Sequence, residues 1–243
     1  AAVKGYPLRI VSSDAFSEEK IRTMRAFGAE VELIPSPEGI TPGLIPSMMG
    51  RAAEITAQTG AFATDQFNNA DMIEGYRRLG EELLGQLPGP PPISAFCSYV
   101  GTAGCFLGVS RALAAALPGL HRAVVEPAES AVLSGGPPGT HHIEGGGIGQ
   151  RPPQLHPADY DQVIAIPEAR AFQLAREAAR EEGIFSGPST GANLAAALDI
   201  ARRFGPGEGI EEVLLHFRKI VCDDRAAAVD VVEDGVAGVA RAR

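Results

Sequence analysis

Strand-like and helix-like segments alternate along this chain, and this alternation limits the possible folds more than any other feature of the sequence. Short apolar or alternating runs predict strands at 8–11, 30–34, 93–100, 122–125, 162–166 and 213–215. Longer segments with apolar residues at helical spacing predict helices at 17–27, 48–59, 75–87, from 104 onward, 168–182 and 190–203. Such a succession is typical of an α/β fold with mostly parallel sheets flanked by helices.

Composition restricts the classes of partner. The 243 residues are 45% hydrophobic, which is enough for a sizeable core, and 30 acidic against 21 basic side chains give a net charge of -9. This charge disfavours nucleic acid and anionic membranes, so we expect a small-molecule partner. No run approaches the length of a membrane span, and the first residues do not resemble a signal peptide. Three cysteines without CxxC spacing predict neither a zinc site nor a disulfide framework, as in a cytoplasmic protein.

A strand, a glycine-rich loop and a helix follow one another at residues 93–110. The loop Gly101-Thr102-Ala103-Gly104-Cys105 has small residues that let the backbone approach a ligand, at the point where a helix begins. These features are typical of a phosphate-binding loop. The loop lacks the Gly-Lys-Ser/Thr ending of a P-loop and the spacing of the dinucleotide motif. Taken alone, a tight turn that needs small residues for packing explains it equally well.

Two further glycine-bearing turns follow, at 143–149 and 187–193. In order and approximate spacing, the three turns resemble those of the cysteine synthase family of pyridoxal-phosphate enzymes. Three other segments are also similar to family motifs: Phe27-Gly28-Ala29-Glu30-Val31, Asp65-Gln66-Phe67-Asn68-Asn69-Ala70 and Val124-Val125-Glu126-Pro127. The resemblance covers nearly the whole chain.

The resemblance implies roles for individual residues. The residues that match the family's phosphate loop are Gly101, Thr102, Ala103, Gly104 and Cys105. Ala103 and Cys105 depart from the usual Gly-Thr-Gly-Gly-Thr, and the methyl of Ala103 is costly if its φ is positive. Gly145 and Gly147 match glycines that border the cofactor ring, although a plain loop role explains them as well. Gln66 matches a glutamine that contacts the substrate carboxylate or the cofactor's side of the cleft, with a solvated side chain as the alternative. Ser189 is expected to be a helix N-cap first and a site residue second.

Two parts of the family pattern differ in this chain. Asp224 stands where the family has a serine that contacts the pyridine nitrogen, so it either favours a protonated pyridinium or is a surface acid. The three lysines, Lys4, Lys20 and Lys219, all lie outside the family's Ser-x-Lys context and are expected to be solvated. We therefore identify no catalytic residue. We expect the chain to lack the N-terminal part of the family fold, with its Schiff-base lysine and Asn-Thr-Gly substrate loop, and to be inactive alone.

The resemblance implies a fold-type-II, tryptophan synthase β-like α/β fold, truncated at its N-terminus, with pyridoxal 5'-phosphate as cofactor. Residues 1–64 would be the remnant of a smaller mobile domain, and residues 65–243 the larger cofactor-anchoring domain. The implied reaction is replacement at Cβ of an activated serine, such as O-acetylserine, by sulfide to give cysteine, in an enzyme that is a homodimer when complete. Alternatives are a serine or threonine dehydratase, a cystathionine β-synthase-like enzyme, or a non-catalytic phosphate-binding or assembly protein of the same fold.

Overall fold

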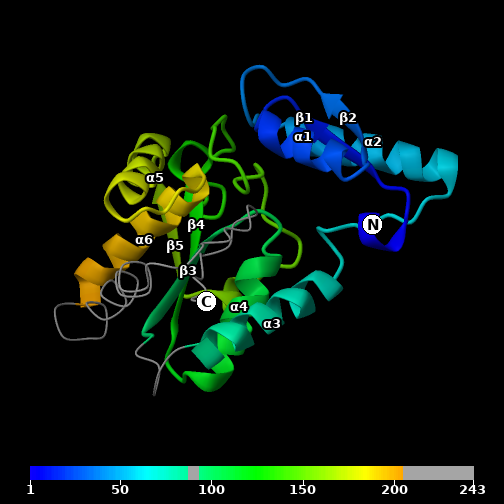
Figure 1. The fold of residues 1–243 in the computed structure, drawn as a ribbon. Helices are drawn as coiled ribbons and strands as arrows, with labels where there is room; N and C mark the ends of the chain where they lie inside the picture. Colours follow the sequence, from blue (N-terminus) through cyan, green and yellow to red (C-terminus); the bar gives the residue numbers. More distant parts are fainter. Residues whose placement is uncertain (87–92, 205–243) are drawn as a thin grey trace.

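The structure is a computed structural model that describes residues 1–86 and 93–204. Its helices and strands form two groups (Figure 1). Residues 1–59, the first lobe, contain β1 (Arg9–Ser13), α1 (Glu18–Ala26), β2 (Glu30–Ile34) and α2 (Leu44–Thr59), preceded by a 3-10 turn, η1 (Ala2–Lys4). The described residues from 71 to 204, the second lobe, contain α3 (Asp71–Gln86), β3 (Ala95–Tyr99), α4 (Gly104–Ala116), β4 (His121–Pro127), η2 (Ala128–Ser130), η3 (Pro157–Asp159), β5 (Gln162–Ile166), α5 (Glu168–Glu181) and α6 (Pro188–Phe204).

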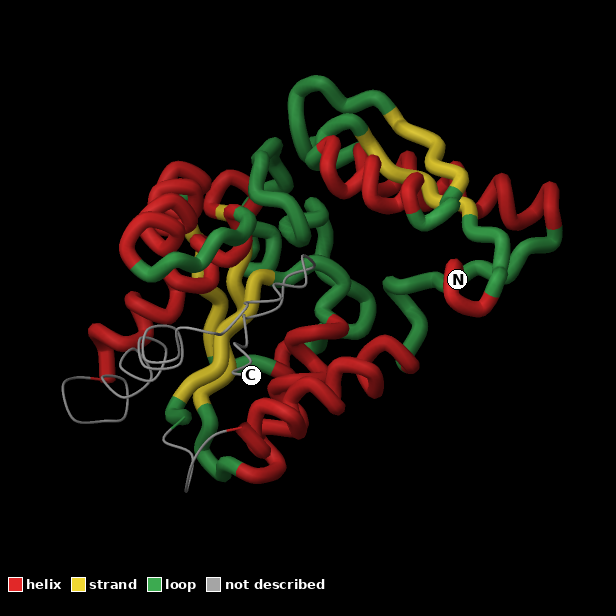
Figure 2. Tube along the Cα trace, in the orientation of Figure 1, coloured by secondary structure: helices red, strands yellow, loops and turns green. Residues whose placement is uncertain are grey.

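The first lobe is built on two parallel strands, β1 and β2, joined through α1. Gly28 follows α1 at φ +86, a left-handed conformation that glycine adopts without strain and that turns the chain into β2. Figure 2 shows both helices lying along this small sheet, at one end of the molecule.

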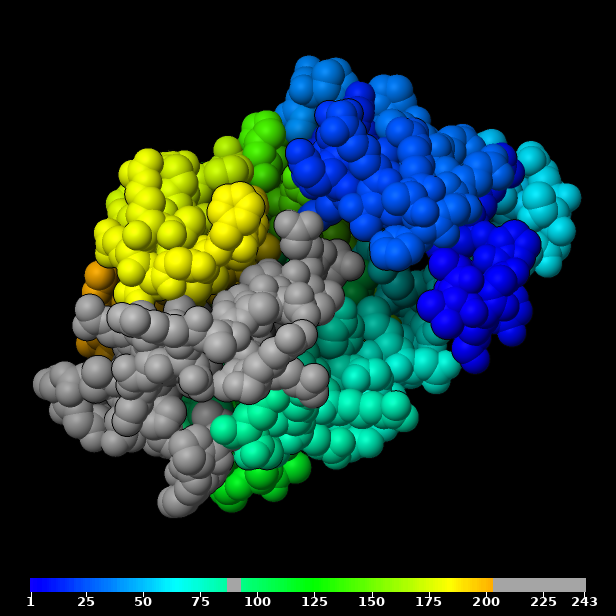
Figure 3. All heavy atoms as spheres, viewed as in Figure 1, coloured from blue at the N-terminus to red at the C-terminus, as the bar shows by residue number. Residues whose placement is uncertain are grey.

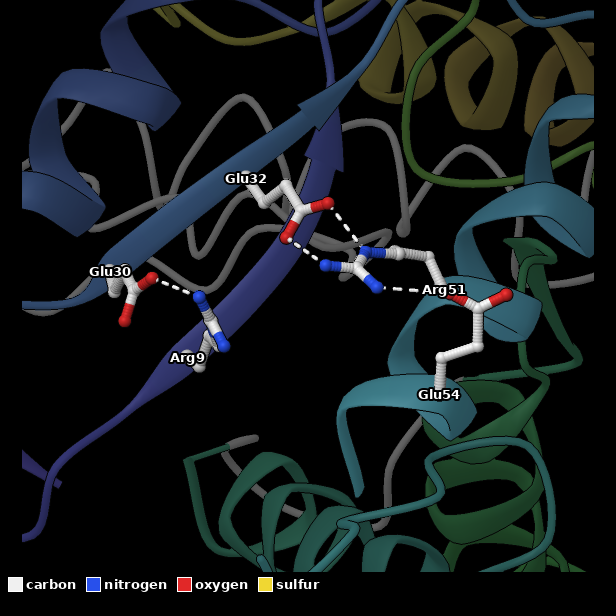
Figure 4. A network of polar contacts seen from close by, with 5 residues as sticks. All are labelled: Arg9, Glu30, Glu32, Arg51 and Glu54. Atoms are coloured by element: carbon white, nitrogen blue, oxygen red, sulfur yellow. Dashed lines mark hydrogen bonds and ion pairs between the residues drawn. The ribbon is translucent and has the colours of Figure 1, made fainter. Parts of the chain in front are cut away.

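Charged side chains link β2 to α2 and β1 to β2 (Figure 4). Arg51 on α2 donates from Nε to Glu32 Oε1 at 2.6 Å and from Nη2 to Glu32 Oε2 at 3.2 Å, and it also pairs with Glu54. The Arg51 guanidinium holds the pKa of the Glu32 carboxyl below its ordinary value. Arg9 on β1 pairs with Glu30 on β2. These pairs join neighbouring elements within the lobe.

The second lobe is a three-layer sandwich around the parallel sheet β3-β4-β5. Successive residues of a strand point to opposite faces, so Val124 and Val125 of β4 enter different cores. Val125 packs with alanines of α5 and α6, including Ala171 and Ala196, on one face. Val124 packs with Leu107 and other residues of α4 on the opposite face, where α3 also lies (Figure 1). The sheet is therefore buried on both sides, as the sequence predicted.

The predicted fold class is confirmed, and the strands at 30–34 and 162–166 match residue for residue. The predicted start of α2 was wrong, since the helix begins at Leu44 and contains Pro46 in its first turn. A proline is tolerated there because the first N–H groups of a helix have no intrahelical partner. α3 also begins earlier than predicted, at Asp71. The predicted strand at 213–215, Lys219, Cys222 and Asp224 lie outside the described residues.

Candidate functional site

The glycine-rich loop connects the end of β3 to the start of α4. Ala103 is the N-cap residue of α4 and adopts φ +71, ψ -1, in the left-handed region. A non-glycine residue pays about 1–2 kcal/mol for this conformation. The φ of Ala103 is therefore positive, which is the conformation in which its methyl is costly. The residue is also only 4% exposed, so the methyl fills space in the core around Phe106 and Leu107.

The start of α4 presents backbone donors. The first intrahelical bond runs from Leu107 N to Ala103 O at 2.9 Å, so the N–H groups of Gly104, Cys105 and Phe106 precede the hydrogen-bond ladder. No side chain among the described residues caps this helix. Free N–H groups at the positive end of a 13-residue helix favour an anion.

A second loop, residues 141–149, packs directly on the first. Gly147 N donates to Val100 O at 3.0 Å, and the Tyr99 hydroxyl donates to Ile143 O at 3.1 Å. A Cβ added to Gly101 would lie 2.6 Å from Gly145 O, a separation that real Cβ atoms essentially never show. The two loops approach this closely because residue 101 has no side chain.

His141 fixes the shape of loop 141–149 from inside. Its ring is fully buried, and Nε2 lies 2.8 Å from Gly147 O, which requires a proton on Nε2 because a carbonyl only accepts. His141 Nδ1 has no hydrogen-bond partner within the described part of the chain. Burial lowers the pKa of His141, which favours the neutral ring. No feature of the sequence predicted this role of His141.

A cavity of about 580 Å³ lies between the two lobes and the two loops. Figure 3 shows the first lobe, in blue, against the second in space-filling form. Residues of the first lobe and its connection that line the cavity are Ser12, Phe16, Glu19, Lys20, Thr23, Met24, Ile40, Ile45, Met48, Gln66 and Phe67. Residues of the second lobe that line it are Met72, Tyr76, Tyr99, Val100, Gly101, Thr102, Ala103, Gly104, Cys105, Phe106, Glu144, Gly145, Gly146 and Ile148.

Most residues singled out in the sequence meet at this cavity. The five residues of the phosphate-type loop, Gln66 and Gly145 all line it. Gly146 lines it where the sequence pointed to Gly147, whose carbonyl instead accepts from His141. Ser189 does not cap α6, because the helix begins one residue earlier, at Pro188.

The position of Lys20 differs from the one that the sequence predicted. It was expected to be a solvated surface charge, but it lines the cavity and its Nζ lies 3.1 Å from Glu144 Oε2. Its side chain is 29% exposed and that of Glu144 19%. The helical pattern around Lys20 indicated an outer face of α1, which is correct for α1 alone. Loop 141–149 covers that face, and no feature of the local sequence reveals this contact.

Cys105 is a partly buried thiol whose pKa is raised, so it is not expected to be reactive. Burial raises the pKa of Cys105 to about 12, opposed by a hydrogen bond from Ser98. Burial also raises the pKa of Cys97 to about 12. Both cysteines are free thiols. The neighbouring Thr102 hydroxyl donates to the sulfur of Met72 at 3.4 Å, which joins the loop to α3.

Comparison with known proteins identifies the family to which this chain belongs. A family model described as "Pyridoxal-phosphate dependent enzyme" matches residues 1–216. The chain belongs to this family. Members of the family depend on pyridoxal phosphate, so the cofactor implied by the sequence is confirmed at the level of the family.

Several individual members of the family are similar to this chain. The chain is 35% identical to a cysteine synthase of Staphylococcus aureus over 214 residues, which are 88% of this chain and 67% of that protein. The crystal structure of a cysteine synthase from Entamoeba histolytica is similar with a TM-score of 0.74 and 31% identity, over 86% of this chain and 60% of that one. An O-acetylserine dependent cystathionine β-synthase from Helicobacter pylori has a TM-score of 0.73 and 34% identity, over 86% and 66%. The chain thus spans about two thirds or less of these family members.

Within residues 1–86 and 93–204, no three His, Cys, Asp or Glu side chains gather in a way that could hold a metal ion. None of the described helices is both long and apolar enough to cross a membrane.

Proposed function

We propose that this chain forms the cofactor-anchoring part of a pyridoxal-phosphate dependent enzyme of the cysteine synthase type. The reaction is replacement at Cβ of an activated serine, such as O-acetylserine, by sulfide. The observation that carries the proposal is the uncapped N-terminus of α4, which opens behind Gly101–Ala103 into a cavity closed by loop 141–149. The similarity to cysteine synthases over most of the chain supports the reaction class.

The residues present fit a phosphate group. The net charge of -9 repels a phosphate at long range, so local dipoles have to hold it. The N–H groups of Gly104, Cys105 and Phe106 supply such dipoles, and the absence of a side chain at Gly101 lets the backbone approach the ligand. Cys105 replaces a hydroxyl by a thiol that donates weakly, so this cradle depends on backbone donors.

Other residues are assigned by their place in the cavity. Gly145 and Gly146, which line the cavity, would border the ring of the cofactor, and Gly147 holds their loop through Val100 and His141. Gln66, which also lines the cavity, would orient the carboxylate of an amino-acid substrate. The cofactor, when bound, supplies the electron sink for loss of the substrate's α-proton and leaving group. The protein's own contribution is to anchor the phosphate, orient the substrate and exclude water.

The proposal includes the organisation of the whole enzyme. Residues 1–64 belong to a smaller mobile domain and residues 65–243 to the anchoring domain, because the substrate cavity lies between the two lobes. The complete enzyme is a homodimer in the cytoplasm, a setting consistent with the free thiols Cys97 and Cys105.

This chain alone is proposed to lack synthase activity. Lys4 is exposed on η1, and the ammonium of Lys20 is paired with Glu144. Neither therefore offers a free amine that is directed at the phosphate cradle. A dehydratase or a cystathionine β-synthase-like enzyme is the second candidate, favoured by the similarity to the H. pylori structure. A non-catalytic protein of the same fold is the third.

One experiment separates these candidates. The purified chain is loaded with pyridoxal phosphate, with pyridoxal as the control that lacks a phosphate, then reduced with borohydride and mapped by mass spectrometry. Loaded protein is also given O-acetylserine with sulfide, with homocysteine or with no nucleophile, and cysteine, cystathionine and keto acid are measured. The same assays are run on a version extended by a Ser-x-Lys-bearing segment ahead of Ala1.

We expect the chain to retain pyridoxal phosphate in preference to pyridoxal, without a reduced lysine adduct, and the extended version to make cysteine. Cystathionine or keto acid as the main product of the extended version would favour the second candidate. A reduced adduct on Lys20 together with cysteine formation by the chain alone would contradict the anchoring role. Equal retention of both compounds would contradict the phosphate cradle.

A further inference from the structure

Loop 141–149 is part of the second lobe and also contacts the first lobe. On the side of the first lobe, Ile40 N donates to His141 O at 3.0 Å and His141 N donates to Ile40 O at 3.4 Å, an isolated antiparallel bridge. A Cβ on Gly149 would lie 3.3 Å from Pro42 Cα, so the far end of the loop also touches the first lobe. On the side of the second lobe, the same loop bonds Val100 through Gly147.

The Lys20–Glu144 ion pair is a third link between the lobes, and it joins side chains. Lys20 projects from α1 and Glu144 from the middle of loop 141–149, 124 positions later in the chain. Among the described residues that line the cavity, Lys20 is the one with a basic side chain. The pair therefore spans the cavity wall where α1 meets the loop.

We propose that Lys20 and Glu144 form a latch that holds the first lobe against loop 141–149 and so controls how often the cavity opens. Both are positioning residues: they act on the loop, and the loop contacts the site. Breaking the pair would remove this side-chain link between α1 and the loop, while the Ile40–His141 bridge stays in place. Such a bridge, with one of its two bonds at 3.4 Å, is expected to open more often without the latch.

The consequence for the site follows from the loop's other contacts. Gly145 packs on Gly101, and Gly147 bonds Val100, next to the phosphate-type loop. When the loop moves away with the opening bridge, a ligand in the cavity loses one wall. Faster ligand release rests on the proposed function, but the opening of the bridge does not.

The pair suits a reversible latch because it is neither fully solvated nor deeply buried. Solvent screening lowers the contribution of most surface ion pairs to stability. With side-chain exposures of 29% and 19%, Lys20 and Glu144 are screened less, yet water still reaches both charges. The link is therefore expected to weaken in salt. Other described ion pairs of the first lobe, including Arg22–Glu18 on α1 and Arg51–Glu32, join elements within that lobe.

The test is a double-mutant cycle read by amide hydrogen exchange in the full chain without cofactor. The variants are Lys20→Met, Glu144→Gln and the two combined, and the amides followed are Ile40 and His141. A cycle is chosen because any further contact of either side chain cancels in the comparison. The matched control uses Arg22→Met and Glu18→Gln, which break a pair on the same helix without crossing between the lobes.

Each single variant should raise exchange at Ile40 and His141 about three- to fivefold, as expected for a partly screened pair. The double variant should exchange no faster than the single ones, 1 M NaCl should remove the difference from the parent chain, and the control variants should leave both amides unchanged. Effects that multiply in the double variant, or no effect in either single one, would overturn the latch.

A second readout links the latch to the site. The dissociation rate of bound pyridoxal phosphate should rise about three- to fivefold in both single variants, in proportion to bridge opening. Changed exchange with no measurable binding of pyridoxal phosphate to any variant would support the latch and contradict the proposed function. Unchanged exchange together with normal binding of pyridoxal phosphate would contradict the latch and support the proposed function.

Discussion

Replacement of Gly101 by alanine tests the close approach of the two loops. The added Cβ would lie 2.6 Å from Gly145 O, against 3.4 Å for the near edge of ordinary contact. The atom that obstructs it is backbone, so it cannot swing aside as a side chain would. Either loop 141–149 or the phosphate-type loop has to retreat by about 0.8 Å, and overpacking of this kind costs about 1–3 kcal/mol.

Part of this cost is recovered, because alanine restricts the unfolded chain more than glycine and so stabilises the fold by about 0.4–1 kcal/mol. The net expectation for Gly101→Ala is a loss of about 1–2 kcal/mol in the free energy of unfolding. Because the displaced loop walls the cradle, affinity for pyridoxal phosphate should also fall, by about tenfold for each 1.4 kcal/mol lost there.

The assay is urea unfolding followed by far-UV circular dichroism, since the chain has no tryptophan, together with equilibrium dialysis against pyridoxal phosphate. Gly50→Ala is the matched control. Gly50 is exposed in the middle of α2 with nothing within 4 Å of an added Cβ, so this change should raise stability by about 0.5–1 kcal/mol and leave binding unchanged. The reasoning would be refuted if Gly101→Ala behaved like Gly50→Ala in both assays.

Two further predictions concern groups whose pKa is shifted by burial. Because burial lowers the pKa of His141, the unfolded chain binds this proton more readily, so the free energy of unfolding should fall as the pH drops below about 6.5. His141→Gln, whose amide can still donate to Gly147 O, should show a shallower loss between pH 7.5 and 5.5 in urea titrations, and an unchanged slope would count against the assignment. With its pKa raised to about 12, the Cys105 thiol should resist alkylation by iodoacetamide at pH 8 in the folded chain and react in urea, as mass mapping would reveal. Rapid labelling of Cys105 in the folded state would show that the thiol is not buried as described.

The sequence predicted the sheet well because strands buried on both faces have a strong local signature. β5 is a run of apolar residues between a polar segment and a proline, and its bounds were correct. The start of α2 was missed because a proline such as Pro46 is typical of a loop, although the first turn of a helix also accepts proline. Proline is compatible both with a loop and with the first turn of a helix, and the local sequence pattern does not decide between them.

The sequence pointed to those residues of the candidate site where the backbone packs closely, and it missed those where side chains meet across the fold. Gly101 and Gly145 were found because close backbone approach requires glycine, which is visible in the sequence. Lys20 and Glu144 were not paired, because 124 positions separate them and α1 looks solvent-facing by itself. The buried His141 was missed for the same reason, since its partner, Gly147 O, is a backbone atom that any residue would provide.

The most direct test of the account is a chemical-shift titration of ¹⁵N-labelled chain with pyridoxal phosphate, and separately with pyridoxal and with inorganic phosphate. The account predicts that pyridoxal phosphate and inorganic phosphate both shift the amides of Gly104, Cys105 and Phe106, and that pyridoxal does not. Shifts confined to other parts of the chain, or equal responses to pyridoxal and to its phosphate, would contradict the claim that the start of α4 holds the cofactor phosphate.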